Sequence, residues 1–236
     1  MHHVVVERWS RGQSALHRRD ARAKLGALLA FLSVVSTTPT GAQPAFAAYS
    51  IVLAAAILAA RLPFRGVLER GAMVLPFSAT FAVVTWLAGE PGRALALAEK
   101  SFLSGIAALV MVATTPIAEL LHGLESMGVP RPLVLVVQFL YRYLFVISEQ
   151  AQHMRLAARS RQGLGAGRRS RFHAATGALG VLFARSWERA DGIQRAMLAR
   201  GFRGHFSLFA PSRFGIGDLV FLCGVVAVSV AIRLAV

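Results

Sequence analysis

The chain has 236 residues, of which 56% are hydrophobic and only 16% are charged, and its mean hydropathy is positive at +0.57. This composition is typical of an integral membrane protein. The formal net charge of +15 would favour a nucleic-acid binder if the chain were soluble. A soluble nucleic-acid binder has no need of long apolar runs, so we expect a lipid bilayer and no nucleic acid as the partner. The single cysteine, Cys223, excludes an internal disulfide and a multi-cysteine metal site.

The first 24 residues form a basic segment ahead of the first apolar stretch. They include Arg8, Arg11, Arg18, Arg19, Arg22 and Lys24. A secretory signal has a shorter basic region, although "STTPTGAQPAFA" imitates a cleavage site. We predict that residues 1–24 are retained as a cytoplasmic N-terminus.

Five apolar segments predict membrane-spanning helices. They run approximately over Leu25–Ser36, Ala45–Ala60, Gly71–Ala88, Leu95–Pro116 and Phe214–Val236. The first two are shorter than the roughly 20 residues that a helix needs to cross hydrocarbon. We therefore expect these two to be tilted, extended by flanking residues, or partly re-entrant.

The charges of the connecting segments set the expected orientation. The stretch "RLPFRGVLER" contains Arg61, Arg65 and Arg70, whereas "GEPGR" offers only Arg93 against Glu90. Basic loops favour the cytoplasmic side. Five crossings from a cytoplasmic N-terminus then place the segment before the last span in the cytoplasm and the C-terminus outside.

The predicted fold is an all-α integral membrane protein with about five transmembrane helices. Long cytoplasmic helices are inserted before the last span. The domains are a basic N-terminus (1–24), transmembrane helices one to four (25–116), a cytoplasmic helical domain (117–213) and the last transmembrane helix (214–236).

One apolar stretch inside the cytoplasmic domain, Pro132–Ser148, resembles a further span. It contains Gln138 and Arg142 four residues apart on one helical face, and it continues without a break into the polar stretch after Glu149. A helix from Pro132 to about Arg161 would be roughly 45 Å long, which favours a position along or below the membrane. A sixth transmembrane helix is the alternative.

Two related hexapeptides end the two long helices that we predict in this domain. "ARSRQG" begins at Ala158, and "ARGFRG" begins at Ala199 after a second helix from about Ser170 to Arg200. Arginine and glycine at a helix end are typical of capping, worth about 0.3–1 kcal/mol. Small residues on both sides of each arginine also suit entry into a narrow groove, where the planar guanidinium binds a carboxylate.

Three stretches together carry a resemblance to a known family. They are "SALHRRDARAKL", the long central run from "TTPIAELLHGLESMGVP" to "VISEQAQHM", and "RAMLARGFRG". With them the chain resembles the transmembrane T component of energy-coupling factor transporters, in particular the CbiQ-type subunit of cobalt and nickel importers. The resemblance covers nearly the whole length.

The resemblance implies that two cytoplasmic coupling helices each end in an Ala-Arg-Gly-like signature that docks on an ATPase subunit. The second signature is Ala199, Arg200 and Gly201, which matches without adjustment. The first is Ala158, Arg159 and Ser160, and we favour Arg159 as its docking residue. Arg161, between Ser160 and Gln162, stays open as the alternative.

The resemblance also implies the partners. These are two ABC-type ATPase subunits that bind ATP and Mg²⁺, and a CbiM- or NikM-like membrane S component that binds the metal ion. A small accessory membrane subunit is an optional member. The chain itself is then expected to hold no cofactor or metal and to reside in the bacterial inner (cytoplasmic) membrane.

The residues themselves predict no catalysis. A phosphate-binding P-loop needs lysine after glycines, and the only lysines, Lys24 and Lys100, do not follow glycine. No histidine pair has ligand spacing on a predicted span, although His2 and His3 are able to bind copper or nickel incidentally. Acidic residues are interleaved with arginine, as in "RSWERADGIQR", and pair with no nucleophile.

These observations predict a noncatalytic subunit that passes ATP-driven motion to a substrate-binding partner for cobalt or nickel uptake. One alternative is the T component of a vitamin importer, for example for biotin. The other is a stand-alone permease, which we expect to place polar residues along its spans. The predicted spans consist almost entirely of Ala, Leu, Val, Phe and Gly with Ser and Thr.

Overall fold

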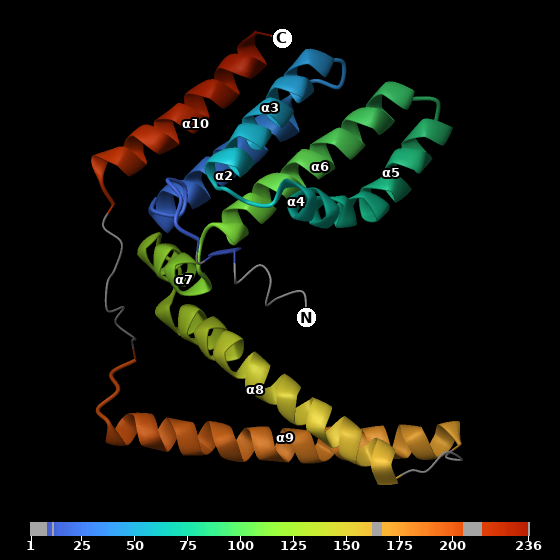
Figure 1. Cartoon of the computed structure of the whole chain (residues 1–236), viewed down its shortest axis with the longest axis vertical. Coiled ribbons are helices and arrows are strands. Elements are labelled where there is room, and N and C mark those ends of the chain that lie inside the picture. The colour runs from blue at the N-terminus through green and yellow to red at the C-terminus, as the bar shows by residue number, and fades with distance from the viewer. Residues whose placement is uncertain (1–8, 11, 162–166, 205–213, 236) are drawn as a thin grey trace. The chain divides into compact units, whose positions relative to one another are not determined.

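A computed structural model describes residues 9–10, 12–161, 167–204 and 214–235, and over these ranges the chain is helical without a β-strand (Figure 1). The chain divides into two compact units. The first comprises Met1–Met127 with Ala210–Val236, and the second comprises Gly128–Phe209. The all-α membrane fold predicted from the sequence is confirmed.

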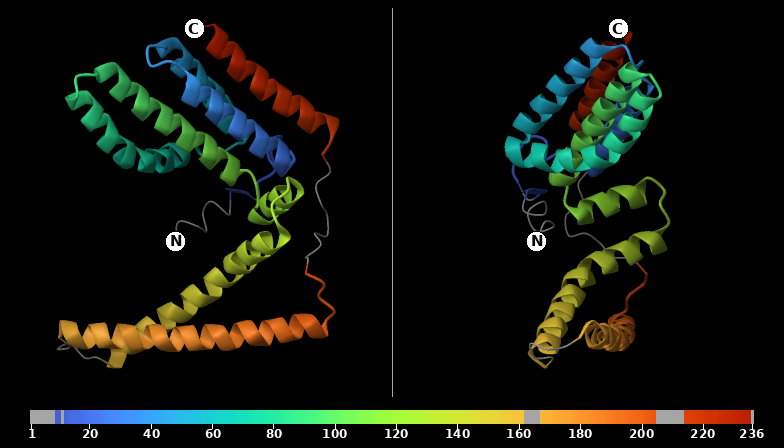
Figure 2. Two further views of the ribbon diagram at one scale, coloured as in Figure 1. Left: turned by 180° about the vertical axis from the view of Figure 1, so that it is seen from behind. Right: turned by 90° about the vertical axis from the view of Figure 1, so that its right-hand side faces the viewer.

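The first unit is a bundle whose main helices run up and down. Its elements are α2 (Ala21–Thr37), α3 (Gln43–Ala59), α4 (Phe64–Gly71), the 3₁₀ turn η1 (Ala72–Val74), α5 (Leu75–Leu87), α6 (Pro91–Ala113), α7 (Ile117–Ser126) and α10 (Ile216–Leu234). The α2–α3 turn, the α5–α6 turn and the C-terminal end of α10 lie at the same end of the bundle (Figures 1 and 2). This arrangement places alternate loops at opposite ends.

Local sequence explains where these helices begin. Asp20 caps α2, because its carboxylate accepts a hydrogen bond from the Arg22 amide at 2.8 Å. Proline stands in the first turn of α3, α5 and α6, where a missing amide hydrogen costs nothing. Each apolar run is thereby started by a residue suited to a helix N-terminus.

The core of the bundle combines a few large side chains with many small ones. Tyr49, Val35 and Ile57 are almost fully buried, and the rings of Phe31 and Tyr49 meet edge to face with centroids 5.7 Å apart. Alanines are buried in α2, α3 and α6. Small residues let helix backbones approach closely, which is how apolar helices pack where water supplies no driving force between them.

Basic side chains join the helices at both ends of the bundle. At one end, Lys100 of α6 donates to the backbone oxygens of Ser36 and Thr38 at 2.8 and 2.7 Å, and Arg233 of α10 hydrogen-bonds to Thr37. At the other end, Lys24 of α2 donates to the Thr114 carbonyl after α6 at 2.8 Å. The lysines thus satisfy carbonyl groups that the helix ends leave without partners.

All five predicted apolar segments are helical. Four helical segments of the described chain are long and apolar enough to cross a membrane: Phe64–Leu87, Pro91–Ala113, Arg131–Arg161 and Ile216–Leu234. The helices α2 and α3 have 17 residues each, in agreement with the expectation that the first two segments are short. Because Arg131–Arg161 also meets these criteria, length and composition do not decide between five spans and six.

The second unit consists of two long helices that pack against each other. The helix α8 spans Arg131–Arg161, and α9 spans Arg168–Ala199. Both long helices predicted from the sequence are confirmed, with their ends within two residues of the expected positions. Of the glycines between the two helices, those at 163 and 165 lie outside the described residues, and Gly167 directly precedes α9.

Candidate functional site

The first hexapeptide forms the last turn of α8. Ala158, Arg159, Ser160 and Arg161 are all helical, and the side chains of Arg159 and Arg161 are exposed. The Ser160 hydroxyl donates to the Ala157 carbonyl of the preceding turn at 2.9 Å. The two arginines therefore extend from the helix end into solvent.

The second hexapeptide ends α9 in a defined C-terminal turn. Ala199 is the last helical residue, Arg200 is the cap, and Gly201 adopts a positive φ of 74°. The Gly201 amide donates to Leu198 and the Phe202 amide to Met197, both at 3.0 Å. This pair of bonds is the Schellman motif, in which a left-handed residue after the cap lets two orphan carbonyls find donors.

The capping and docking interpretations differ in what the guanidinium groups contact. Within the described residues, Arg159, Arg161 and Arg200 make no side-chain hydrogen bond to their own helix and pair with no carboxylate. Backbone amides close the end of α9, so the Arg200 side chain is not needed for capping. The arginines retain only the general attraction of a cation to a helix C-terminus.

The two arginine sites are not placed identically. Arg200 is one residue beyond its helix, whereas Arg161 is the last residue of α8 and Arg159 lies two residues earlier. By distance from the helix end, Arg161 resembles Arg200 more closely than Arg159 does. The choice between Arg159 and Arg161 is therefore left to a mutational test.

The two helix ends are far apart. A helix of 32 residues such as α9 is roughly 48 Å long, since each residue rises about 1.5 Å. The chain from Arg161 to Arg168 spans at most about 25 Å when extended. The end of α8 and the end of α9 are therefore separated by about 20 Å or more.

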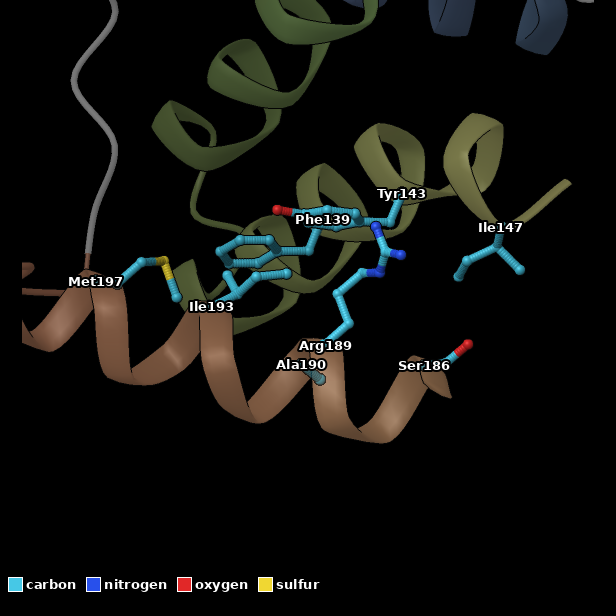
Figure 3. Close-up of a pocket in the computed structure, with 8 residues that line it drawn as sticks. All are labelled: Phe139, Tyr143, Ile147, Ser186, Arg189, Ala190, Ile193 and Met197. Carbon is cyan, nitrogen blue, oxygen red and sulfur yellow. The ribbon is translucent and has the colours of Figure 1, made fainter. Parts of the chain in front are cut away.

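Aromatic and aliphatic side chains form the seam between α8 and α9 (Figure 3). The rings of Phe139 and Tyr143 on α8 are stacked with centroids 6.3 Å apart. Ile193 and Met197 extend toward them from α9, and Arg189 of α9 reaches up beside Tyr143. The hollow between these groups measures about 310 Å³ and is largely apolar.

A second hollow of about 340 Å³ adjoins the first at the C-terminal end of α9. Its lining residues are Phe139, Arg142, Tyr143, Ile193, Ala196, Met197, Arg200 and Phe202. It thus brings an arginine from the middle of α8 to the same cavity as the predicted docking residue Arg200. We call it the two-arginine hollow.

Arg142 and Glu149 stand seven residues apart on α8. In the structure Glu149 is 3.8 Å from His153, and Arg142 has no acidic partner among the described residues. Arg142 was missed as a site residue because only the packing of α9 on α8 brings it to Arg200. On α9, Asp191 and Arg195 form an exposed ion pair at 2.5 Å.

The described residues contain no group of three or more histidine, cysteine or acidic side chains able to hold a metal ion. His2 and His3, which the sequence suggested as incidental ligands, lie outside the described residues. The candidate sites in the described part of the chain are therefore the two helix ends and the two hollows, and this part contains no metal centre of this kind.

The fold and site define an all-α, multi-pass membrane protein in which a separate unit presents two long, arginine-tipped helices. The sequence model of the CbiQ family, described as "cobalt transport protein", matches residues 12–208, and the chain belongs to this family. It is therefore a membrane component of a cobalt transporter and a non-enzymatic member of a membrane transporter complex.

One named relative agrees with this membership, and two further relatives are uncharacterized. The chain is 29% identical over 192 residues to the cobalt transport protein CbiQ of Rhodobacter capsulatus, covering 77% of this chain and 78% of that protein. It is 32% identical over 108 residues to the uncharacterized protein MJ1089 of Methanocaldococcus jannaschii, covering 45% and 40% of the two chains. A second protein of that organism, MJ1571, is 25% identical over 115 residues, covering 49% and 39%.

Proposed function

We propose that the chain is the noncatalytic T subunit of an energy-coupling factor importer. It transmits the ATP-driven motion of two ATPase subunits to a substrate-binding membrane subunit for uptake of cobalt, with nickel as the second candidate ion. The observation that carries the proposal is the pair of exposed arginines, Arg159 or Arg161 and Arg200, each at the end of a long helix.

The separation of the helix ends supports two ATPase docking sites. Because the ends lie about 20 Å or more apart, one groove of ordinary size does not accommodate both. If each end is held by a different ATPase subunit, closure of the ATPase pair on ATP must change the angle between α8 and α9 or move both helices together. The chain then acts as a mechanical linkage between two states of the transporter.

The arginine content of the second unit supports an acidic partner. Residues 128–209 contain thirteen arginines, three acidic residues and no lysine. Arginine presents a planar set of donors that matches a carboxylate in a bidentate geometry, which lysine does not. Grooves lined by carboxylates on the ATPase subunits would complement this surface.

The packing of α8 on α9 favours five spans over six. The helix α9 contains eight charged residues and is not among the helices apolar enough to cross a membrane. Each charge at the centre of a bilayer costs about 2.5–3.5 kcal/mol on insertion scales. Since Phe139 and Tyr143 of α8 pack against α9, we place both helices outside the hydrocarbon, on the cytoplasmic side with the N-terminus.

An exposed stripe on α9 is the candidate contact for the substrate-binding subunit. Phe172, Leu179, Phe183 and Trp187 follow one face of the helix and are each 66–70% exposed. Exposed apolar patches of this kind mark interaction surfaces. In this proposal the ATPase subunits bind ATP and Mg²⁺, and the substrate-binding partner binds the transported ion.

The proposal predicts that the docking arginines contribute to complex formation far beyond a capping effect. Replacing Arg159 or Arg200 with alanine removes a cap worth at most about 1 kcal/mol, so the protein should still fold and insert. If each arginine docks, its loss also leaves a carboxylate unpaired in the partner groove, at a cost of about 2–5 kcal/mol. We expect each variant to bind the ATPase encoded beside it at least tenfold more weakly, with metal uptake impaired.

The same measurements decide which arginine of α8 docks and whether the arginines dock or only cap their helices. The double variant of Arg159 and Arg200 should lose uptake almost completely, and Arg161→Ala tests which arginine of α8 docks. Arg185→Ala is the control, because this exposed arginine lies in the middle of α9 and lines neither hollow. Full ATPase binding and transport by Arg159→Ala, Arg161→Ala and Arg200→Ala alike would reduce the helix ends to caps.

A further inference from the structure

The end of α9 is a composite surface built by two helices. Arg200 follows α9, and Arg142 extends from the middle of α8 into the same two-arginine hollow. Neither guanidinium has a carboxylate partner among the described residues. The Arg142 guanidinium lies over the Tyr143 ring, 5.9 Å from its centroid. Two cations that share one cavity repel each other unless an anion lies between them.

The remaining walls of the two-arginine hollow are apolar. Phe139 and Tyr143 form one side with stacked rings, and Ile193, Met197 and Phe202 form the other. The Schellman turn keeps the Phe202 backbone at this end of α9, because the Phe202 amide bonds to the Met197 carbonyl. The cavity is therefore lined by aromatic and aliphatic side chains together with two guanidinium groups.

This combination specifies its ligand. Apolar walls suit a hydrophobic side chain, and the two guanidiniums suit a carboxylate on the same segment. We propose that the two-arginine hollow is the receptor for a protein segment of the ATPase partner in which an acidic residue adjoins an apolar one, and that Arg142 binds this segment together with Arg200. This inference rests on the proposed function and extends the docking site of α9 to a second helix.

A composite receptor has a mechanical consequence. A partner segment held by Arg200 alone would pull on the end of α9, whereas one held by both arginines contacts α8 and α9 at their seam. The position of the partner would then depend on how the two helices pack at Phe139 and Met197. Binding at this site is thereby coupled to the angle between the helices.

The test measures the affinity of the full-length protein in detergent for the purified ATPase encoded beside it. Arg142→Gln removes the charge but keeps a polar, though shorter, side chain, and we expect about tenfold weaker binding. Arg142→Lys keeps the charge and should recover part of the affinity. Arg185→Gln, matched in chemistry but outside the hollow, should change the dissociation constant by less than twofold.

Combining the changes tests whether the two arginines share a ligand. If they do, the loss in the double variant Arg142→Gln/Arg200→Ala should be smaller than the product of the two single losses. Wild-type affinity in Arg142→Gln, with weakened binding in Arg200→Ala, would overturn this inference and leave the proposed function intact. Wild-type affinity in Arg200→Ala would overturn this inference together with the docking role of α9, and wild-type affinity in Arg159→Ala and Arg161→Ala as well would overturn the proposed function. Equal losses in Arg142→Gln and Arg142→Lys would assign Arg142 to helix packing and also overturn the inference.

Discussion

At the residue scale, the N-terminal stretch "SALHRRDARAKL" acquires a structural explanation. The Ser14 hydroxyl lies 2.7 Å from His17 Nδ1, and His17 Nε2 lies 2.9 Å from the Trp9 carbonyl oxygen. The Asp20 amide donates to the carboxylate of Asp218 on α10 at 3.1 Å. The stretch thus joins α2 to α10 through polar groups, most of them withdrawn from solvent.

Lys24 completes this network from inside the bundle. Its ammonium group donates to the carbonyls of Thr114 and His17 and to the Thr115 hydroxyl, and the residue is only 4% exposed. Three protein acceptors match the three donors of the ammonium group. A buried charge is tolerated only when its hydrogen bonds are made in this way.

Replacement of Lys24 should therefore destabilise the first unit. Lys24→Met keeps the length of the side chain but leaves buried acceptors without a donor, at a cost of about 2–4 kcal/mol. We expect the unfolding temperature in detergent to fall by about 5 °C or more. Arg18→Met, an exposed neighbour, serves as the control, and equal unfolding temperatures of both variants would show that the buried hydrogen bonds contribute little.

At the element scale, helix positions were predictable and helix partners were not. The apolar runs indicated the long helices of the bundle, because such a pattern acts through neighbours in the sequence, although the third helical segment begins at Phe64 and not at Gly71. The shared cavity of Arg142 and Arg200 arises from the packing of α8 on α9. Such packing depends on side-chain fit between residues far apart in the chain, so no local sequence pattern predicts it.

The C-terminal turn of α9 gives a test at the same scale. Gly201 has a φ of 74°, and a Cβ atom built there would meet nothing within 4 Å. Gly201→Ala should therefore cost about 1–2 kcal/mol through the backbone alone. We expect faster hydrogen exchange at the Phe202 amide, together with a several-fold loss of ATPase affinity.

The matched control for this change is Gly192→Ala. Gly192 lies inside α9, has equally open surroundings and has ordinary helical φ. Alanine is favoured over glycine in a helix interior by about 0.5–1 kcal/mol, so this variant should be neutral or stabilising. Unchanged exchange at Phe202 in Gly201→Ala would mean that the Schellman turn does not need its glycine.

At the scale of the whole molecule, the proposed orientation rests on the basic connection that follows α3. Lys100 and Arg233 bind the end of α2 at the extremity that carries the α2–α3 turn. Arg61 lies in the connection between α3 and α4, and Arg65 lies in the first turn of α4. If the connection from Arg61 to Arg70 lies in the cytoplasm, the α2–α3 and α5–α6 turns lie outside.

Cysteine labelling tests this topology and the disputed position of α8 together. Cys223 is replaced by alanine, and single cysteines are introduced at Gly41 and Gly92, beside the α2–α3 and α5–α6 turns, and at Gly167 and Gly192 of the second unit. All four sites are exposed in the structure. With α8 and α9 in the cytoplasm, an impermeant maleimide should label Gly41→Cys and Gly92→Cys in spheroplasts, and Gly167→Cys and Gly192→Cys only in inverted vesicles.

A sixth span through α8 would reverse the result at Gly167, because the residue follows that helix directly. The proposed ATPase subunits act on the cytoplasmic face. Labelling of Gly167→Cys from outside would therefore place the start of α9 on the side of the membrane opposite the ATPases. This result would contradict both the five-span topology and the proposed coupling function.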